Sequence, residues 1–184
     1  MQSKFQILKA ARVIQKEGVI AYPTESVYGL GCNPLSENAV LKILHLKHRP
    51  VEKGLIIIAA NITQLRPFID ITDQDEEKIH QYKSAMTWLV NKSELTPHWI
   101  SGKHNKVAIR VSKHPTVIDL CNKLNHPIVS TSANPARLKP ANTALQARHY
   151  FSDRIDMYLN GNTGELLTPT PITDLETDKK IRNS

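Results

Sequence analysis

The longest apolar run in the chain, Leu55–Ala60, is the sequence feature that most restricts its fold. The run is strand-sized and far short of the roughly 20 residues that span a membrane. It shows no alternation of apolar and polar positions, which is typical of a strand covered on both faces. Covering both faces requires a packed layer on each side, so the run predicts an α/β protein and no membrane segment.

Helices and strands mix along the rest of the chain. Apolar residues at helical spacing predict helices that follow the N-cap residues Ser3 and Ser36. Thr72 and Asp75 form a variant capping box for another helix, and Pro115 suits the first position of a fourth. Further strands are predicted at Val19–Tyr22, Met86–Val90, Val107–Val111, Pro127–Val129 and Met157–Leu159, with a last helix at Asn142–Tyr150.

The connections complete the expected architecture. Thr24–Pro34 is predicted to be a loop, and roughly the last 25 residues to be polar and irregular. Parallel crossovers are expected in the first half of the chain, and hairpins around Met86–Val111. Because no repeat and no domain-length linker is visible, residues 1–184 predict a single α/β domain with a mixed sheet.

Composition limits the class of protein. The net charge of +7 favours an anionic partner, although a generally solvated lysine surface explains the charge alone equally well. Two cysteines, Cys32 and Cys121, and the lack of a signal-peptide pattern before Gly18 predict a reduced, cytoplasmic protein. The histidines show no zinc-ligand spacing, so no protein-held metal is predicted.

Two polar segments directly follow predicted strands, which is where α/β folds collect ligands. Thr24, Glu25 and Ser26 come after the strand that Pro23 closes, and a capped turn is the simpler interpretation of them. Ser130–Asn134 supplies hydroxyls and an amide that could cradle phosphate or ribose, without the glycine spacing of a Walker loop.

Cations gather in two other segments. Lys47, Arg49 and Lys53 lie close together between two apolar elements, and the helix dipole explains one of them well but all three poorly. Arg110 lies between Ile109 and Val111, so it faces the opposite side of the sheet. There it is either solvated or placed to clamp a carboxylate or phosphate.

The sequence shows no Ser-His-Asp or Cys-His arrangement and no carboxylate pair. That absence favours a reaction driven by positioning and charge neutralisation, as phosphoryl and nucleotidyl transfers are. We therefore expect an enzyme with a basic cleft for a nucleoside triphosphate, built on Lys47–Arg49 and Ser130–Asn134.

Four ordered segments resemble the YrdC/TsaC family of threonylcarbamoyl-AMP synthases: AYPTESVYGLG, LKHRPVEKGLIII, VAIRVSKHP and PIVSTSAN. The most specific parts are the K-x-R signature at Lys47–Arg49 and the S-x-N signature at Ser132–Asn134. The resemblance implies a twisted mixed sheet flanked by helices, with a large basic concave face. It also implies a nucleotidyltransferase that converts L-threonine, bicarbonate and ATP into threonylcarbamoyl-adenylate and pyrophosphate, for modification of tRNA.

The same resemblance implies roles for single residues, among which Lys47 and Arg49 would stabilise developing charge. ATP would be held, with Mg²⁺ bridging its phosphates, by Lys47, Arg49, Lys53, Lys106, Ser132, Asn134, Thr143 and Arg182. Threonine would be held by Thr24, Ser26, Arg110, Ser132 and Thr170. Downstream tRNA threonylcarbamoyl-transferase proteins would take the product, and tRNA or double-stranded RNA could bind directly.

The chain departs from the family pattern at three loops. Lys83–Met86 replaces a Pro-Gly-Pro turn, Pro135–Arg137 replaces Ser-Gly, and Pro169–Pro171 replaces Pro-Ser-Thr. Two other interpretations therefore stay open. One is a non-catalytic RNA-binding protein that uses the same basic concavity, and the other is a paralogue that adenylates another amino acid or uses another carbamoyl donor.

Overall fold

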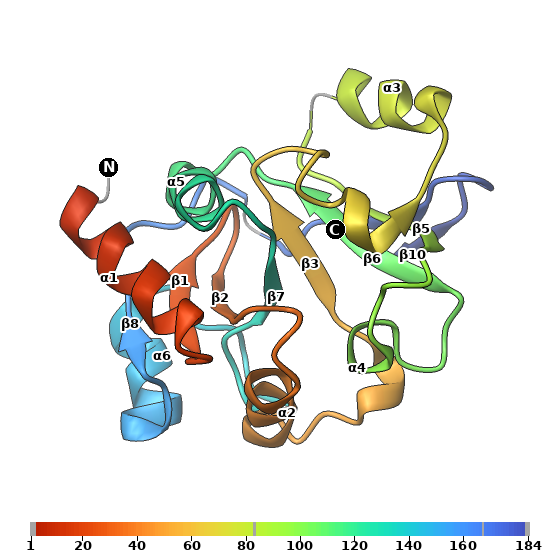
Figure 1. Cartoon of the computed structure of the whole chain (residues 1–184). Helices are drawn as coiled ribbons and strands as arrows, with labels where there is room; N and C mark the ends of the chain where they lie inside the picture. The colour runs from red at the N-terminus through yellow and green to blue at the C-terminus, as the bar shows by residue number, and fades with distance from the viewer. Residues whose placement is uncertain (1–2, 83, 167, 183–184) are drawn as a thin grey trace.

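A mixed β-sheet runs through the computed structural model, which describes residues 3–82, 84–166 and 168–182 (Figure 1). In that part of the chain the strand order is β10-β9-β5-β6-β3-β7-β2-β1-β8, with β4 beside β5. The strands are β1 Ile20–Pro23, β2 Tyr28–Gly31, β3 Ile56–Ala59, β4 Ile69–Asp70, β5 Thr87–Lys92, β6 Lys106–Val111, β7 Ile128–Ser132, β8 Met157–Tyr158, β9 Ile172–Asp174 and β10 Lys180–Arg182. The predicted mixed sheet of an α/β fold is confirmed.

Helices flank the sheet, and their ends follow the predicted capping residues. They are α1 Lys4–Gln15, α2 Glu37–Leu46, α3 Asp73–Gln81, α4 His98–Ser101, α5 Pro115–Leu124 and α6 Ala144–Phe151, with 3₁₀ turns η1 Val51–Lys53, η2 Arg66–Phe68 and η3 Ser152–Arg154. Ser3 and Ser36 accept hydrogen bonds from backbone N–H groups of α1 and α2, as N-caps do. Thr72 and Asp75 form the reciprocal capping box of α3. None of these described helices is long and apolar enough to cross a bilayer.

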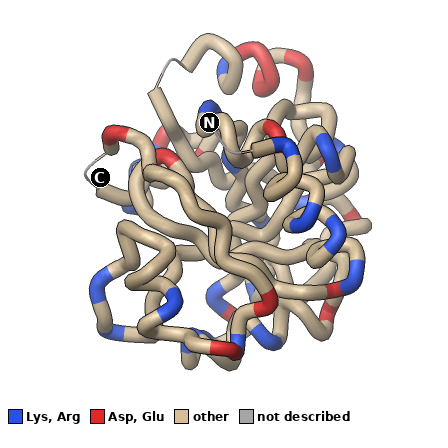
Figure 2. The backbone as a smooth tube through the Cα atoms, turned by 90° about the vertical axis from the view of Figure 1, so that its left-hand side faces the viewer, with Lys and Arg blue, Asp and Glu red and all other residues tan. Residues whose placement is uncertain are grey.

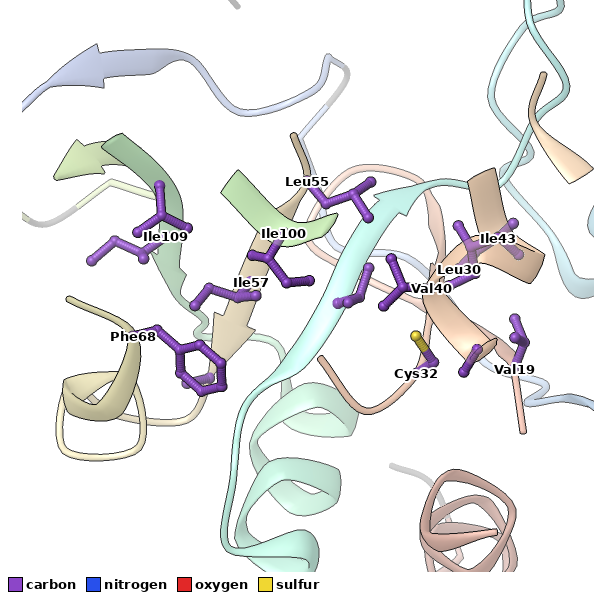
Figure 3. Close-up of a cluster of buried hydrophobic side chains, with 14 of the residues drawn as sticks. Val19, Leu30, Cys32, Val40, Ile43, Leu55, Ile57, Phe68, Ile100 and Ile109 are labelled. Carbon is purple, nitrogen blue, oxygen red and sulfur yellow. The ribbon is translucent and has the colours of Figure 1, made fainter. Parts of the chain in front are cut away.

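The central strand β3 is buried on both faces, as its unbroken apolar run predicts. Ile57 and Ala59 belong to a cluster with Val40 and Ile43 of α2, part of which is drawn in Figure 3. Ile58 points to the other face, where α1 and α5 pack side by side. Each isoleucine buried in this way contributes about 2 kcal/mol of hydrophobic stabilisation.

Two segments that were predicted to be irregular form strands. β2 lies inside the expected loop Thr24–Pro34 and pairs antiparallel with β1. Its glycines suggest a loop, but here they make room, because a Cβ at Gly31 would lie 2.6 Å from Cε1 of Tyr22. The polar tail forms β9 and β10, which pair with the sheet through backbone hydrogen bonds. Because backbone groups make these bonds whatever the side chains are, no apolar pattern in the sequence marked the two strands.

The predicted hairpin at residues 86–111 is confirmed by the antiparallel pairing of β5 and β6. The expected parallel crossovers in the first half are wrong, because β1 and β2 form a tight antiparallel pair instead. Parallel pairs join β3 to β6, β1 to β8 and β5 to β9, and each of them spans a long stretch of chain.

Candidate functional site

A cavity of about 650 Å³ opens where helices stop covering one face of the sheet. Ile58 is covered by the α1 and α5 layer, whereas Ile56, two residues earlier on the same face, lines the cavity. The strand register places Leu89, Ala108, Ile56 and Ser130 in one row across β5, β6, β3 and β7, and all four line the cavity. The floor is therefore apolar and ends in a hydroxyl.

Cationic side chains surround this floor. The lining includes Arg49, Lys53, Lys103, Lys106, Arg110 and Arg182, and none of the described lining residues is Asp or Glu. Acidic residues gather elsewhere, above all on α3 at the top of Figure 2. Cations in a cleft with low-dielectric walls concentrate anions there. The cavity is therefore the candidate for the predicted basic cleft.

The K-x-R segment owes its geometry to the end of α2. Arg49 N–H donates to Leu44 O at 2.9 Å and His48 N–H to His45 O at 3.0 Å, while His48 adopts a left-handed φ of 49°. This pattern is a Schellman motif, which reverses the chain direction at the helix end. The reversal sends the two cations of the signature to different places.

Lys47 points away from the cavity lining and into the protein. Its Nζ donates to the backbone oxygens of Ser132 and Asn134, the latter at 2.7 Å. Burial, with the nearby charge of Arg49, lowers the pKa of Lys47 to about 8. Lys47 therefore joins the end of α2 to the S-x-N segment at the end of β7. This strand continues to Ser132, whereas the sequence predicted that it would end at Val129.

Arg49 turns into the cavity wall. Its Nη2 donates to Gly54 O at 2.9 Å and to Lys53 O at 3.4 Å, and its buried Nε has no hydrogen-bond partner among the described residues. Burial lowers the pKa of this guanidinium below its ordinary value. Because this N–H lies beside an open cavity, it can donate to an anion that enters there.

Arg110 forms a buried ion pair with Glu25. Glu25 was not among the site residues predicted from the sequence. Arg110 Nη1 lies 3.3 Å from Glu25 Oε2, and Glu25 Oε1 accepts from the Ser112 hydroxyl at 2.5 Å and the Lys113 N–H at 3.1 Å. Burial alone would raise the pKa of Glu25, but Arg110, Ser112 and the backbone N–H groups outweigh it and lower that pKa. Arg110 faces the cavity, opposite to buried Ile109, as predicted.

The tail closes one wall of the cavity. Arg182 Nη2 donates to the backbone oxygen of Thr170 at 2.6 Å, and the Thr170 hydroxyl lies 2.9 Å from that of Thr87. Burial lowers the pKa of Arg182, and the charges of Arg110 and Arg49 add to the effect. Three guanidinium groups from distant parts of the sequence thus share one electrostatic environment.

The other predicted residues divide into those on the cavity and those beside it. Thr24, Ser26, Lys53 and Ser132 line it. Lys106 also lines it, but its Nζ is paired with both carboxylate oxygens of Asp174 and with Glu176.

Asn134 and Thr143 are not among the lining residues. Asn134 holds the 135–138 turn by donating to Pro135 O and Leu138 O, and no described residue donates a hydrogen bond to its buried Oδ1. Thr143 caps α6 through the Gln146 N–H. Their predicted roles toward ATP stay predictions. Of the divergent loops, Pro135–Arg137 forms this turn, with a left-handed φ of 69° at Arg137, while Lys83 lies outside the described residues.

Known proteins resemble this chain over nearly its whole length. The Sua5/yciO/yrdC family model, described as telomere recombination, matches residues 12–184. The threonylcarbamoyl-AMP synthase of Cellvibrio japonicus is 46% identical over 177 residues, which cover 95% of this chain and 94% of the relative. The threonylcarbamoyl-AMP synthase of Pseudomonas aeruginosa strain UCBPP-PA14 is 47% identical over 184 residues, or 99% of each chain.

A solved structure shows the same fold. The structure of P. abyssi Sua5 complexed with L-threonine matches with a TM-score of 0.86 and 31% identity, over 92% of this chain and 51% of that one. The chain therefore spans about half the length of that Sua5 protein.

Proposed function

The chain belongs to the Sua5, YciO and YrdC family, and we propose that it is a threonylcarbamoyl-AMP synthase whose active site is the cavity on β3, β6 and β7. The observation that carries the site assignment is the convergence of Arg49, Arg110 and Arg182 on one cavity, with no described Asp or Glu in its lining. That arrangement suits two anionic substrates at once, a triphosphate and an amino-acid carboxylate.

Arg49, Lys53 and Arg182 bind the triphosphate in this proposal. They are cations of the cavity lining for which no ion pair with a described carboxylate is found, so their full charge is available. Arg110 binds the threonine carboxylate, and Thr24, Ser26, Ser132 and Thr170 bring hydroxyls to the amino-acid half. Lys47 acts as a positioning residue that holds the Ser132–Asn134 backbone.

The chemistry requires little beyond positioning and charge. The threonine ammonium group first releases a proton to solvent, and the resulting amine combines with bicarbonate to give a carbamate and water. A carbamate oxygen then attacks the α-phosphorus of ATP. The bond to the β-phosphate oxygen breaks, pyrophosphate leaves, and threonylcarbamoyl-adenylate remains. Because the attacking carbamate is already anionic, no protein base is needed. Fixed guanidinium groups in a cavity stabilise the growing negative charge on the phosphate oxygens.

Mg²⁺ enters this scheme as part of the ATP substrate. The donor set of the cavity fits that role, because the described lining offers hydroxyls and cations but no carboxylate that would hold the ion itself. When bound, Mg²⁺ would neutralise phosphate oxygens and help pyrophosphate to leave. The adenylate would pass to tRNA-modifying partner proteins in the cytoplasm.

The test is pyrophosphate release from ATP by the full chain. We expect release that requires both L-threonine and bicarbonate, with threonylcarbamoyl-adenylate identified by mass spectrometry. Release that is indifferent to threonine would reject the proposal. An equal rate with serine, valine or another amino acid in place of threonine would instead identify a paralogue with a different substrate.

A further inference from the structure

The cations of the cavity fall into two electrostatic groups. Arg49 and Arg182 donate to backbone carbonyl oxygens, which leave the charge of a guanidinium in place. Arg110 instead faces a carboxylate, since its Nη1 lies 3.3 Å from Glu25 Oε2 and both side chains are buried. Arg49 and Arg182 therefore keep their positive charge, whereas Glu25 largely neutralises the charge of Arg110.

Hydrogen bonds to both its side chain and its backbone hold Glu25 in place. One carboxylate oxygen accepts from the Ser112 hydroxyl and the Lys113 N–H. The backbone is fixed as well, because Leu166 N–H donates to Glu25 O at 3.1 Å and Gly164 N–H to Thr24 O at 2.9 Å. A Cβ at Gly164 would lie 2.6 Å from Glu25 O, so the covering segment approaches closely. Glu25 thus has a defined position beneath the cavity.

We infer that Glu25 is a specificity-determining residue that reserves Arg110 for a singly charged carboxylate and keeps phosphate groups away from it. This inference rests on the proposed function. The electrostatic repulsion between Glu25 and an approaching anion grows with the charge of that anion. Glu25 therefore repels a phosphate chain, which carries several negative charges, more strongly than an amino-acid carboxylate, which carries one. The triphosphate is then directed to Arg49, Lys53 and Arg182, whose charges are not cancelled.

The remaining donors of Arg110 suit the smaller anion. Its Nη1 donates to Glu25, whereas its buried Nε has no hydrogen-bond partner in the part of the chain that the structure describes. A guanidinium recognises a carboxylate best through two parallel N–H donors, and binding there would satisfy the orphaned Nε. Arg110 can therefore bind a carboxylate through correctly oriented N–H donors, while the charge of Glu25 cancels the long-range electrostatic attraction of Arg110 for other anions.

The experiment is a calorimetric titration of L-threonine into the full chain, with and without inorganic phosphate as the competing anion. In the unmodified chain we expect the threonine Kd to be unaffected by phosphate. In Glu25→Gln, which keeps the shape and removes the charge, phosphate should weaken threonine binding about tenfold or more, the size expected when a full charge a few ångströms away is lost. Threonine binding that stays independent of phosphate in Glu25→Gln would overturn the inference.

Two further variants keep the test sharp. Glu25→Asp keeps a carboxylate charge at this position, so phosphate should still not compete with threonine; competition by phosphate as strong as that expected for Glu25→Gln would also overturn the inference. This outcome stands even where Glu25→Gln fails to fold. Asp156→Asn is the matched control, because it removes a carboxylate that pairs with Lys42 outside the cavity lining. Failure of the proposed function would appear separately, as threonine-independent pyrophosphate release by the unmodified chain.

Discussion

The Nζ of Lys47 lies 2.7 Å from the backbone oxygen of Asn134 and also donates to that of Ser132, so one ammonium group joins the K-x-R and S-x-N signatures. The two signatures are more than 80 residues apart in the sequence. Their link explains why a lysine is suited to this position, since an ammonium supplies several donors that can be aimed at separate carbonyl groups. The same burial that makes the link possible affects the titration of Lys47.

Stability should rise at alkaline pH because of Lys47. Its pKa is about 8 in the folded protein and ordinarily 10.5, so between these values the unfolded chain binds more protons than the folded one. Stability therefore increases as the pH rises through this window, by up to about 3 kcal/mol. Urea unfolding between pH 7.5 and 10.5 would measure it, as the difference between the unmodified chain and Lys47→Met.

The matched control for this prediction is Lys42→Met, which removes a half-exposed lysine that pairs with Asp156. We expect its stability to follow the unmodified chain between pH 7.5 and 10.5, apart from a constant offset. If Lys47→Met keeps the same alkaline rise as Lys42→Met, the rise has another source and the assignment to Lys47 is wrong.

Arg49→Ala should lower kcat/KM for ATP by about 100-fold or more, the size typical of removing a preorganised donor to a developing charge. Arg49→Lys should recover only part of this, because an ammonium lacks the planar fork. Circular dichroism should show an intact fold, since Arg49 Nη2 donates to backbone oxygens of the adjacent turn. Arg66→Ala, which breaks the remote pair with Glu76, is the control and should retain activity. Normal turnover by Arg49→Ala would remove this residue from the triphosphate site.

Two of the non-glycine residues that end helices with a positive φ are Glu17, at 60°, and His48, at 49°. Replacing either with Gly should raise the free energy of unfolding by about 1 kcal/mol, because the steric cost of a Cβ there exceeds the added chain entropy of the unfolded state. The sites lie in different helices, so the gains should add. Chemical denaturation is the measurement, and Glu17→Ala and His48→Ala, which keep the Cβ, should show no such gain.

Local sequence patterns predicted the buried central strand and the starts of helices. They could not predict which segments that are distant in the sequence pair with one another. The burial of β3 was predictable because Leu55–Ala60 has no polar face to expose. The helix starts at Ser36 and Thr72 were predictable because a cap is bonded within three residues of itself. In contrast, β2 contains glycines that fit against the Tyr22 ring of another strand, which no local pattern records.

The site shows the same division. The strand position of Arg110 was enough to predict the face that it points to. Its partner Glu25 is 85 residues away, so their pairing could not be inferred from spacing. A lone carboxylate directly after a buried strand, in a chain rich in cations, was the only signal available. Likewise, Lys106 is neutralised by Asp174 and Glu176 from a tail that seemed irregular.

Arg182 should contribute to ATP binding and little to the fold. It lies in the terminal strand β10 and donates to the Thr170 backbone at 2.6 Å, while its guanidinium lines the cavity near Arg49 and Arg110. Arg182→Ala should therefore raise KM for ATP about tenfold, as loss of a charge-assisted contact to phosphate does, with an unchanged melting temperature. Lys180→Ala is the matched control, because Lys180 is an exposed cation of the same strand that is not among the lining residues. Equal increases of KM in the two variants would mean that only the net charge of the tail matters, whereas an effect confined to Arg182 requires its guanidinium to reach the nucleotide from this wall of the cavity.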